Sequence, residues 1–192
     1  MRAAEALPGP QLFGHFLPQK LGQTARLELG RIPQTQCFRP AGKLLIVGTG
    51  QRGESGEIGS APLLDGLALL GKLRDAGIRC AVGSSGCRAN VDFVLEKCDI
   101  ESFFDAKING DMVTRCKPDP EIYLKAAEAL RLRPEECVVF EDARAGIEAG
   151  DRAGMKVVAL ATTLSREELE RTAATLVIDD FTQMSVERFR SL

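Results

Sequence analysis

The sequence lacks any long apolar run and any strong excess of charge. None of its 192 residues fall in a hydrophobic stretch approaching the ~18 residues that a membrane helix requires. The formal net charge is −2, which provides no positive field for nucleic acid. We therefore expect no membrane and no nucleic-acid partner, and the length suits one domain of ordinary size.

The cysteines lack regular spacing and include no C-x-x-C pair. The six positions are Cys37, Cys80, Cys87, Cys98, Cys116 and Cys137. A chain of this length with such spacing is not typical of a secreted disulfide framework, so we expect reduced thiols and a cytoplasmic location. The start of the chain has no signal-peptide apolar core, and the lack of serine in residues 1–43 argues against a transit peptide.

Aspartate is missing from the first 64 residues, and Asp65 is the first in the chain. The charge also changes along the sequence. Residues 1–60 carry seven Lys/Arg and four Asp/Glu, a balance of +3, whereas residues 61–192 carry 18 and 23, a balance of −5. Residues 1–42 contain proline and glycine without a sustained hydrophobic period, which predicts an irregular or disordered extension before a core over 43–192.

Within that core, short apolar runs alternate with segments of helical spacing. This alternation predicts an α/β fold, a three-layer, Rossmann-like parallel sheet with helices on both faces. The expected strands cover 44–47, 78–82, 106–108, 138–140, 156–160 and 176–178, and the expected helices cover 62–76, 91–98, 118–130, 145–153, 166–172 and 184–190. Ligands of such sheets bind at the carboxyl ends of the strands.

Three polar groups follow expected strands. Ser84 and Ser85 precede a helix, where they could bind an oxyanion or act as an ordinary helix N-cap. Lys117 lies before Pro118, whose rigid backbone would fix the direction of an ammonium beside a phosphate, although a surface lysine is the plainer interpretation. Glu141 and Asp142 end a buried strand, and Mg²⁺ would relieve their repulsion, unless both are simply solvated.

These groups occur in order within segments 76–111, 116–130 and 137–162, which resemble the haloacid dehalogenase superfamily, in particular its beta-phosphoglucomutase-like phosphatases. The resemblance is strongest over residues 62–162. It implies that Ser84 binds a phosphoryl group, with Ser85 and Asn90 nearby, and that Lys117 steadies phosphate and nucleophile. It also implies that Glu141 and Asp142 hold Mg²⁺, that Gly146 has a structural role, and that the substrate is a small phosphorylated metabolite.

The chain departs from this family at the first motif, Asp-x-Asp, whose first aspartate attacks phosphorus. No aspartate precedes Asp65, and the run 44–47 would place Gly48 and Gly50 where the two aspartates belong. Only 33 residues separate Gly50 from Ser84, too few for the usual cap domain. Either the first sixty residues are foreign to the family, through truncation or fusion, or the chain is a capless relative without catalysis.

We therefore expect a phosphatase or phosphomutase fold with little or no turnover. Two alternatives stay open. One is a non-catalytic interaction protein built on the same fold. The other is a dinucleotide-binding module, because Gly48, Gly50 and Gly53 fit G-x-G-x-x-G after a strand, although the residues that follow form a poor helix.

Overall fold

The computed structural model describes residues 44–49 and 60–192. The expected extension over residues 1–42 lies outside this part. The strands are β1 Leu44–Thr49, β2 Cys80–Ser84, β3 Ala106–Ile108, β4 Cys137–Glu141, β5 Lys156–Leu160 and β6 Leu176–Ile178. The helices are α1 Ser60–Asp75, α2 Arg88–Lys97, α3 Glu121–Ala129, α4 Arg144–Arg152, α5 Arg166–Leu169 and α6 Val186–Ser191, with 3₁₀ turns η1 Glu101–Phe103, η2 Gly110–Met112, η3 Pro134–Glu136 and η4 Phe181–Gln183.

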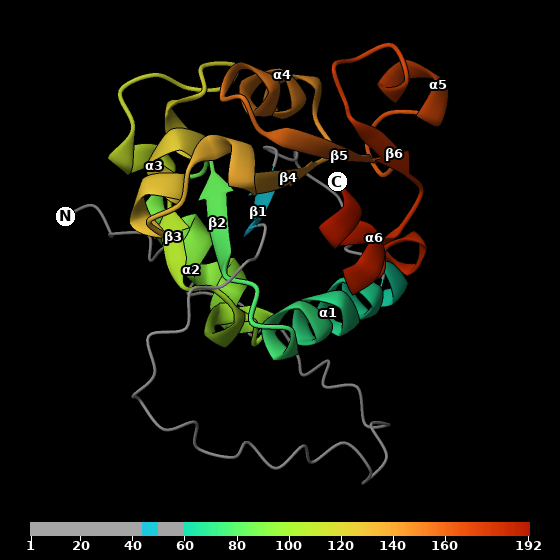
Figure 1. Cartoon of the computed structure of the whole chain (residues 1–192). Coiled ribbons are helices and arrows are strands. Elements are labelled where there is room, and N and C mark those ends of the chain that lie inside the picture. Colours follow the sequence, from blue (N-terminus) through green and yellow to red (C-terminus); the bar gives the residue numbers. More distant parts are fainter. Residues whose placement is uncertain (1–43, 50–59) are drawn as a thin grey trace, which may run out of the picture. The chain divides into compact units, whose positions relative to one another are not determined.

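All strand pairs are parallel, and the sheet order is β3-β2-β1-β4-β5-β6 (Figure 1). The chain thus winds outward in two directions from β1. The predicted α/β fold with a parallel sheet is confirmed. No helix among the described residues has the length and apolar character needed to span a bilayer.

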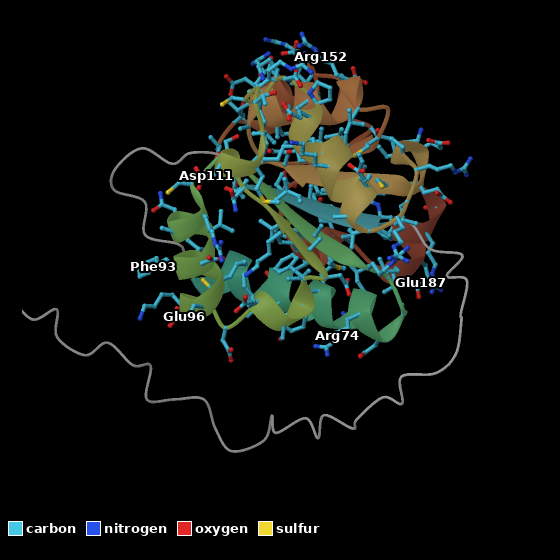
Figure 2. The ribbon with its side chains drawn as sticks, turned by 90° about the vertical axis from the view of Figure 1, so that its left-hand side faces the viewer. Arg74, Phe93, Glu96, Asp111, Arg152 and Glu187 are labelled. Carbon is cyan, nitrogen blue, oxygen red and sulfur yellow. The ribbon has the colours of Figure 1, made fainter. Side chains whose placement is uncertain are left out.

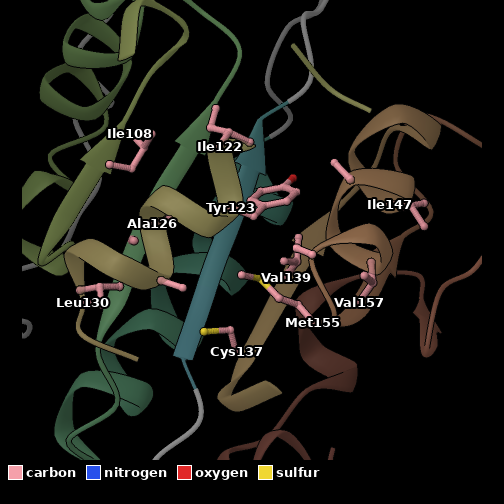
Figure 3. Packing of buried hydrophobic residues seen from close by; sticks show 14 of the residues in the cluster. Ile108, Ile122, Tyr123, Ala126, Leu130, Cys137, Val139, Ile147, Met155 and Val157 are labelled. Atoms are coloured by element: carbon pink, nitrogen blue, oxygen red, sulfur yellow. The ribbon is translucent and has the colours of Figure 1, made fainter. Parts of the chain in front are cut away.

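Side chains of β4 alternate between two hydrophobic layers because successive residues of a strand point to opposite faces. Cys137 and Val139 pack with α3 and α4, as Figure 3 shows, in a cluster that includes Ile122 and Ile147. Val138 and Phe140 pack on the other face, against α1 and α6. The Phe140 ring lies 5.9 Å from that of Phe181 and 6.4 Å from that of Phe189.

Helix ends follow local chemistry. The predicted stop at Gly77 is confirmed, since α1 ends at Asp75 and Gly77 adopts φ +72°, a left-handed conformation that suits glycine. The helix predicted over 166–172 ends earlier, at Leu169. The Thr172 hydroxyl donates a hydrogen bond to the Leu169 carbonyl, which satisfies that acceptor outside a helix.

Between β1 and β2 the described residues form a single helix, α1. Residues 50–59 lie outside the described part, so the expected lack of a cap domain stays a prediction. A dinucleotide-binding glycine motif would need a helix that opens directly after β1, and the residues concerned, 50–59, also lie outside the described part. That alternative therefore stays a prediction.

Candidate active site

The carboxyl ends of β2, β1 and β4 lie side by side at one edge of the sheet. Gly48 of β1 pairs with Gly83 of β2, and Thr49 pairs with Ser84. On the other side, β1 pairs with β4, which ends at Glu141. The sheet therefore brings the predicted residues Ser84 and Glu141 to either side of the end of β1.

Lys117 reaches this edge from the loop that precedes α3. Its peptide bond to Pro118 is cis, and its side chain is only 7% exposed. The ammonium Nζ donates to the Gly83 carbonyl oxygen at 3.2 Å and to Glu141 Oε1 at 2.5 Å. The plainer interpretation, a surface lysine, is therefore wrong, because the side chain of Lys117 is buried and bonds to the ends of both β2 and β4.

Glu141 is a buried carboxylate, and each of its two oxygens already accepts two hydrogen bonds. Its side chain is fully buried, and Oε1 accepts from Lys117 Nζ and from the Tyr123 hydroxyl, the latter at 2.6 Å. Oε2 accepts from the backbone amides of Asp142 at 3.0 Å and Ala143 at 3.1 Å. A cation could bind Glu141 only if one of these four donors left.

Tyr123 is the residue of this candidate site that the sequence analysis missed. It extends from α3 toward α4 in Figure 3, and it is completely buried. Burial, together with the Glu141 charge and hydrogen bond, raises the pKa of Tyr123 well above its usual value. Its ring also lies under the Lys117 ammonium, with 4.8 Å between Nζ and the ring centroid. The available signal was that Tyr123 is the only tyrosine in the chain and follows Lys117 by six residues.

Asp142 points elsewhere than its neighbour Glu141. It is partly exposed, and its Oδ2 accepts from the Thr163 hydroxyl at 2.6 Å and from the Thr162 hydroxyl at 3.4 Å. Both threonines follow β5. Asp142 therefore presents a carboxylate, oriented by hydroxyl groups, at the same sheet edge.

Asp142 fits the oxygen chemistry of Mg²⁺, whereas Glu141 does so only at the expense of an existing hydrogen bond. Among the residues that the structure describes, no three His, Cys, Asp or Glu side chains gather as a metal site. A magnesium ion here would need oxygen atoms from water or from a phosphate as well as Asp142. Mg²⁺ commonly completes its coordination in that way.

The loop after β2 is held tightly against the turn after β3. Ser84 is 6% exposed and its hydroxyl accepts from the Gly86 amide at 3.1 Å. The Gly110 amide donates to the Gly86 carbonyl at 2.8 Å. A Cβ on Gly110 would lie 2.5 Å from the Ser85 carbonyl oxygen, so only glycine allows this approach.

The start of α2 differs from the predicted alternative of a serine N-cap. Ser84 is the last residue of β2, and Cys87 precedes the helix without a capping side chain. Instead the Arg88 amide donates to Asp111 Oδ2 at 2.9 Å, and Figure 2 shows Asp111 at the end of α2 away from Glu96. Asn90 lies exposed in the first turn of α2.

Gly146 lies in the first turn of α4, directly against Glu141. A Cβ at this position would be 1.9 Å from Glu141 Oε1 and 2.0 Å from Cδ. Real contacts of this kind do not occur, so the residue must be glycine for Glu141 to keep its place. The structural role predicted for Gly146 has this physical basis.

The haloacid dehalogenase-like hydrolase family matches residues 34–154, more than half of the chain. Validoxylamine A 7'-phosphate phosphatase of Streptomyces hygroscopicus subsp. limoneus is 37% identical over 126 residues, which cover 65% of this chain and 58% of that protein.

Two solved structures show the same similarity. CbbY from Rhodobacter sphaeroides, solved in complex with phosphate, matches at TM-score 0.60 and 30% identity over 66% of this chain and 57% of that one. The beta-phosphoglucomutase of Clostridium difficile matches at TM-score 0.58 and 30% identity over 65% and 53%. The chain spans little more than half the length of each of these three relatives.

Proposed function

The chain belongs to the haloacid dehalogenase-like hydrolases, and from that membership we propose that it binds the phosphate group of a small phosphorylated metabolite with little or no hydrolysis. Ser84 and Lys117 would hold the phosphate, with Ser85 and Asn90 nearby. Asp142 would hold Mg²⁺, which supplies positive charge against the phosphate oxygens. Binding to phosphate in CbbY and the phosphatase activity in the name of the Streptomyces relative support this substrate class.

The position of β1 carries the proposal. Its end lies between β2 and β4, and its Gly48 pairs with Gly83 at the level of the Lys117 contact. The sequence there is Gly48-Thr49-Gly50, which has no carboxylate to attack phosphorus. Loss of a covalent nucleophile lowers kcat by a factor on the order of 10⁶ in a well-studied case. The remaining hydrogen bonds and charges can still bind an anion.

A p-nitrophenyl phosphate assay with Mg²⁺ tests the lack of hydrolysis. We expect the wild type and Lys117→Ala to turn over equally slowly, at the level of the buffer. Lys97→Ala, which removes an exposed lysine at the last position of α2, is the charge-matched control. Turnover by the wild type that Lys117→Ala abolishes and Lys97→Ala leaves intact would contradict the proposal.

Titration calorimetry with orthophosphate and Mg²⁺ tests binding. We expect weak binding by the wild type and by Lys97→Ala. We expect a markedly larger dissociation constant for Lys117→Met, which keeps the length of the side chain and removes its charge. An absence of heat for the wild type at millimolar ligand would refute the phosphate site. That result would favour the alternative of a non-catalytic interaction protein over a phosphate-binding protein.

A further inference from the structure

We propose that Glu141 and Tyr123 act together as positioning residues for Lys117, and that Glu141 serves the lysine rather than a metal ion. The inference rests on the proposed phosphate site, because Lys117 is the cation of that site. It assigns a role to Tyr123, which neither the sequence motifs nor the similarity to known proteins singled out.

The Lys117 ammonium is surrounded on several sides by these groups. It donates to the Gly83 carbonyl oxygen and to Glu141 Oε1, and the Tyr123 ring lies 4.8 Å from Nζ. A cation over an aromatic face is attracted electrostatically, more strongly where water is excluded. The ammonium is consequently held at one point next to the ends of β2 and β4.

Glu141 can hold the lysine because its own position is fixed. The amides of Asp142 and Ala143 bind Oε2, which orients the carboxylate at the start of the loop to α4. Gly146 packs so closely behind Oε1 that the carboxylate has no room to move toward α4. The Tyr123 hydroxyl then donates to the same Oε1 that accepts from Lys117.

The charges agree with this assignment. A buried carboxylate is costly unless it is paired and hydrogen-bonded, and Glu141 has both a cation and three neutral donors. Lys117, only 7% exposed, needs the same compensation. Removing Glu141 to serve a metal ion would leave the lysine buried without its anion. Asp142, which bonds to threonine hydroxyls instead, can contact a cation without that loss.

Two measurements on the full chain separate positioning from simple core packing. The first is the ¹⁵N NMR signal of the lysine ammonium, which becomes visible when hydrogen bonds and burial slow its exchange with water. The second is the dissociation constant for orthophosphate in the presence of MgCl₂. The variants are Tyr123→Phe, Lys117→Met, the double variant and Ile122→Val. Ile122 is buried beside Tyr123 on α3, so its variant trims the same core as the control.

We expect one protected ammonium signal in the wild type and in Ile122→Val, and its loss in Lys117→Met. Tyr123→Phe should shift it, speed its exchange and weaken phosphate binding about fivefold, the effect of one net hydrogen bond. In the Lys117→Met background, Tyr123→Phe should change phosphate affinity no further, because it acts through the lysine.

The results that overturn the assignment are equally definite. An unchanged ammonium signal in Tyr123→Phe would overturn it, as would equal effects of Tyr123→Phe and Ile122→Val. A further loss of affinity in the double variant would also overturn it. If the signal responds as expected while the wild type binds no phosphate, the positioning role stands and the proposed function fails, so the two proposals are tested separately.

Discussion

Gly146→Ala should disrupt the candidate site through one methyl group. The added Cβ would lie 1.9 Å from Glu141 Oε1, whereas ordinary contact begins at 3.4 Å, so the oxygen must move by the difference, 1.5 Å. The hydrogen bonds that Oε1 accepts from Lys117 and Tyr123 are 2.5 and 2.6 Å long. A displacement of that size breaks both of them and separates a buried ion pair.

The cost follows from that rupture. Breaking a buried ion pair costs about 3–5 kcal/mol, while replacing glycine by alanine within a helix returns about 0.5–1 kcal/mol. We therefore expect Gly146→Ala to lower the free energy of unfolding by about 2–4.5 kcal/mol. The matched control is Gly71→Ala in α1, where a Cβ would meet nothing within 4 Å. This control should be neutral or stabilise the protein by up to about 1 kcal/mol.

Urea unfolding followed by far-UV circular dichroism measures both variants against the wild type. The ammonium signal of Lys117 should also disappear in Gly146→Ala and persist in Gly71→Ala. Equal unfolding midpoints for Gly146→Ala and the wild type would refute the reasoning, because they would mean that Glu141 is not confined where the structure places it.

Two further predictions concern pH and thiol chemistry. Burial raises the pKa of the Cys80 and Cys137 thiols from 9.0 to about 12 and that of Tyr123 well above 10.0. The unfolded chain releases these protons first, so the stability they contribute is complete below pH 9.0 and declines as pH rises above it. The urea midpoint of unfolding should therefore fall as pH rises above 9.0. Tyrosinate absorbance reports Tyr123 alone, because the chain has no second tyrosine and no tryptophan, and it should rise only when the protein unfolds. Iodoacetamide should alkylate the exposed thiols of Cys87 and Cys116 in the folded protein and leave the buried thiols of Cys80 and Cys137 unmodified. Peptide mapping measures this, and labelling of Cys80 at the rate of Cys87 would contradict the described core.

The order of the elements could be predicted from the sequence because each depends on local pattern. The strands over 106–108, 156–160 and 176–178 have the predicted bounds, because a short apolar run between two turns leaves little choice of where the strand begins and ends. The helix α5 ends at Leu169, three residues before the predicted bound, where the Thr172 hydroxyl bonds to the Leu169 carbonyl. Hydrophobic periodicity does not report a hydrogen bond between a side chain and the backbone, so it cannot place this end of the helix.

In the candidate site, too, the sequence pattern could not predict which side chains contact one another. The adjacency of Glu141 and Asp142 suggested two repelling carboxylates that a metal ion would reconcile. The fold separates them instead. Glu141 turns inward to a lysine 24 residues earlier in the chain, and Asp142 turns toward the threonines after β5. Sequence alone could identify the charged groups, but only the folded structure reveals that Tyr123 contacts both Lys117 and Glu141. Because Lys117 is held in this way, the site keeps a fixed cation near the end of β1. The sequence Gly48-Thr49-Gly50 offers no carboxylate there to attack phosphorus, and for this reason we expect binding without turnover.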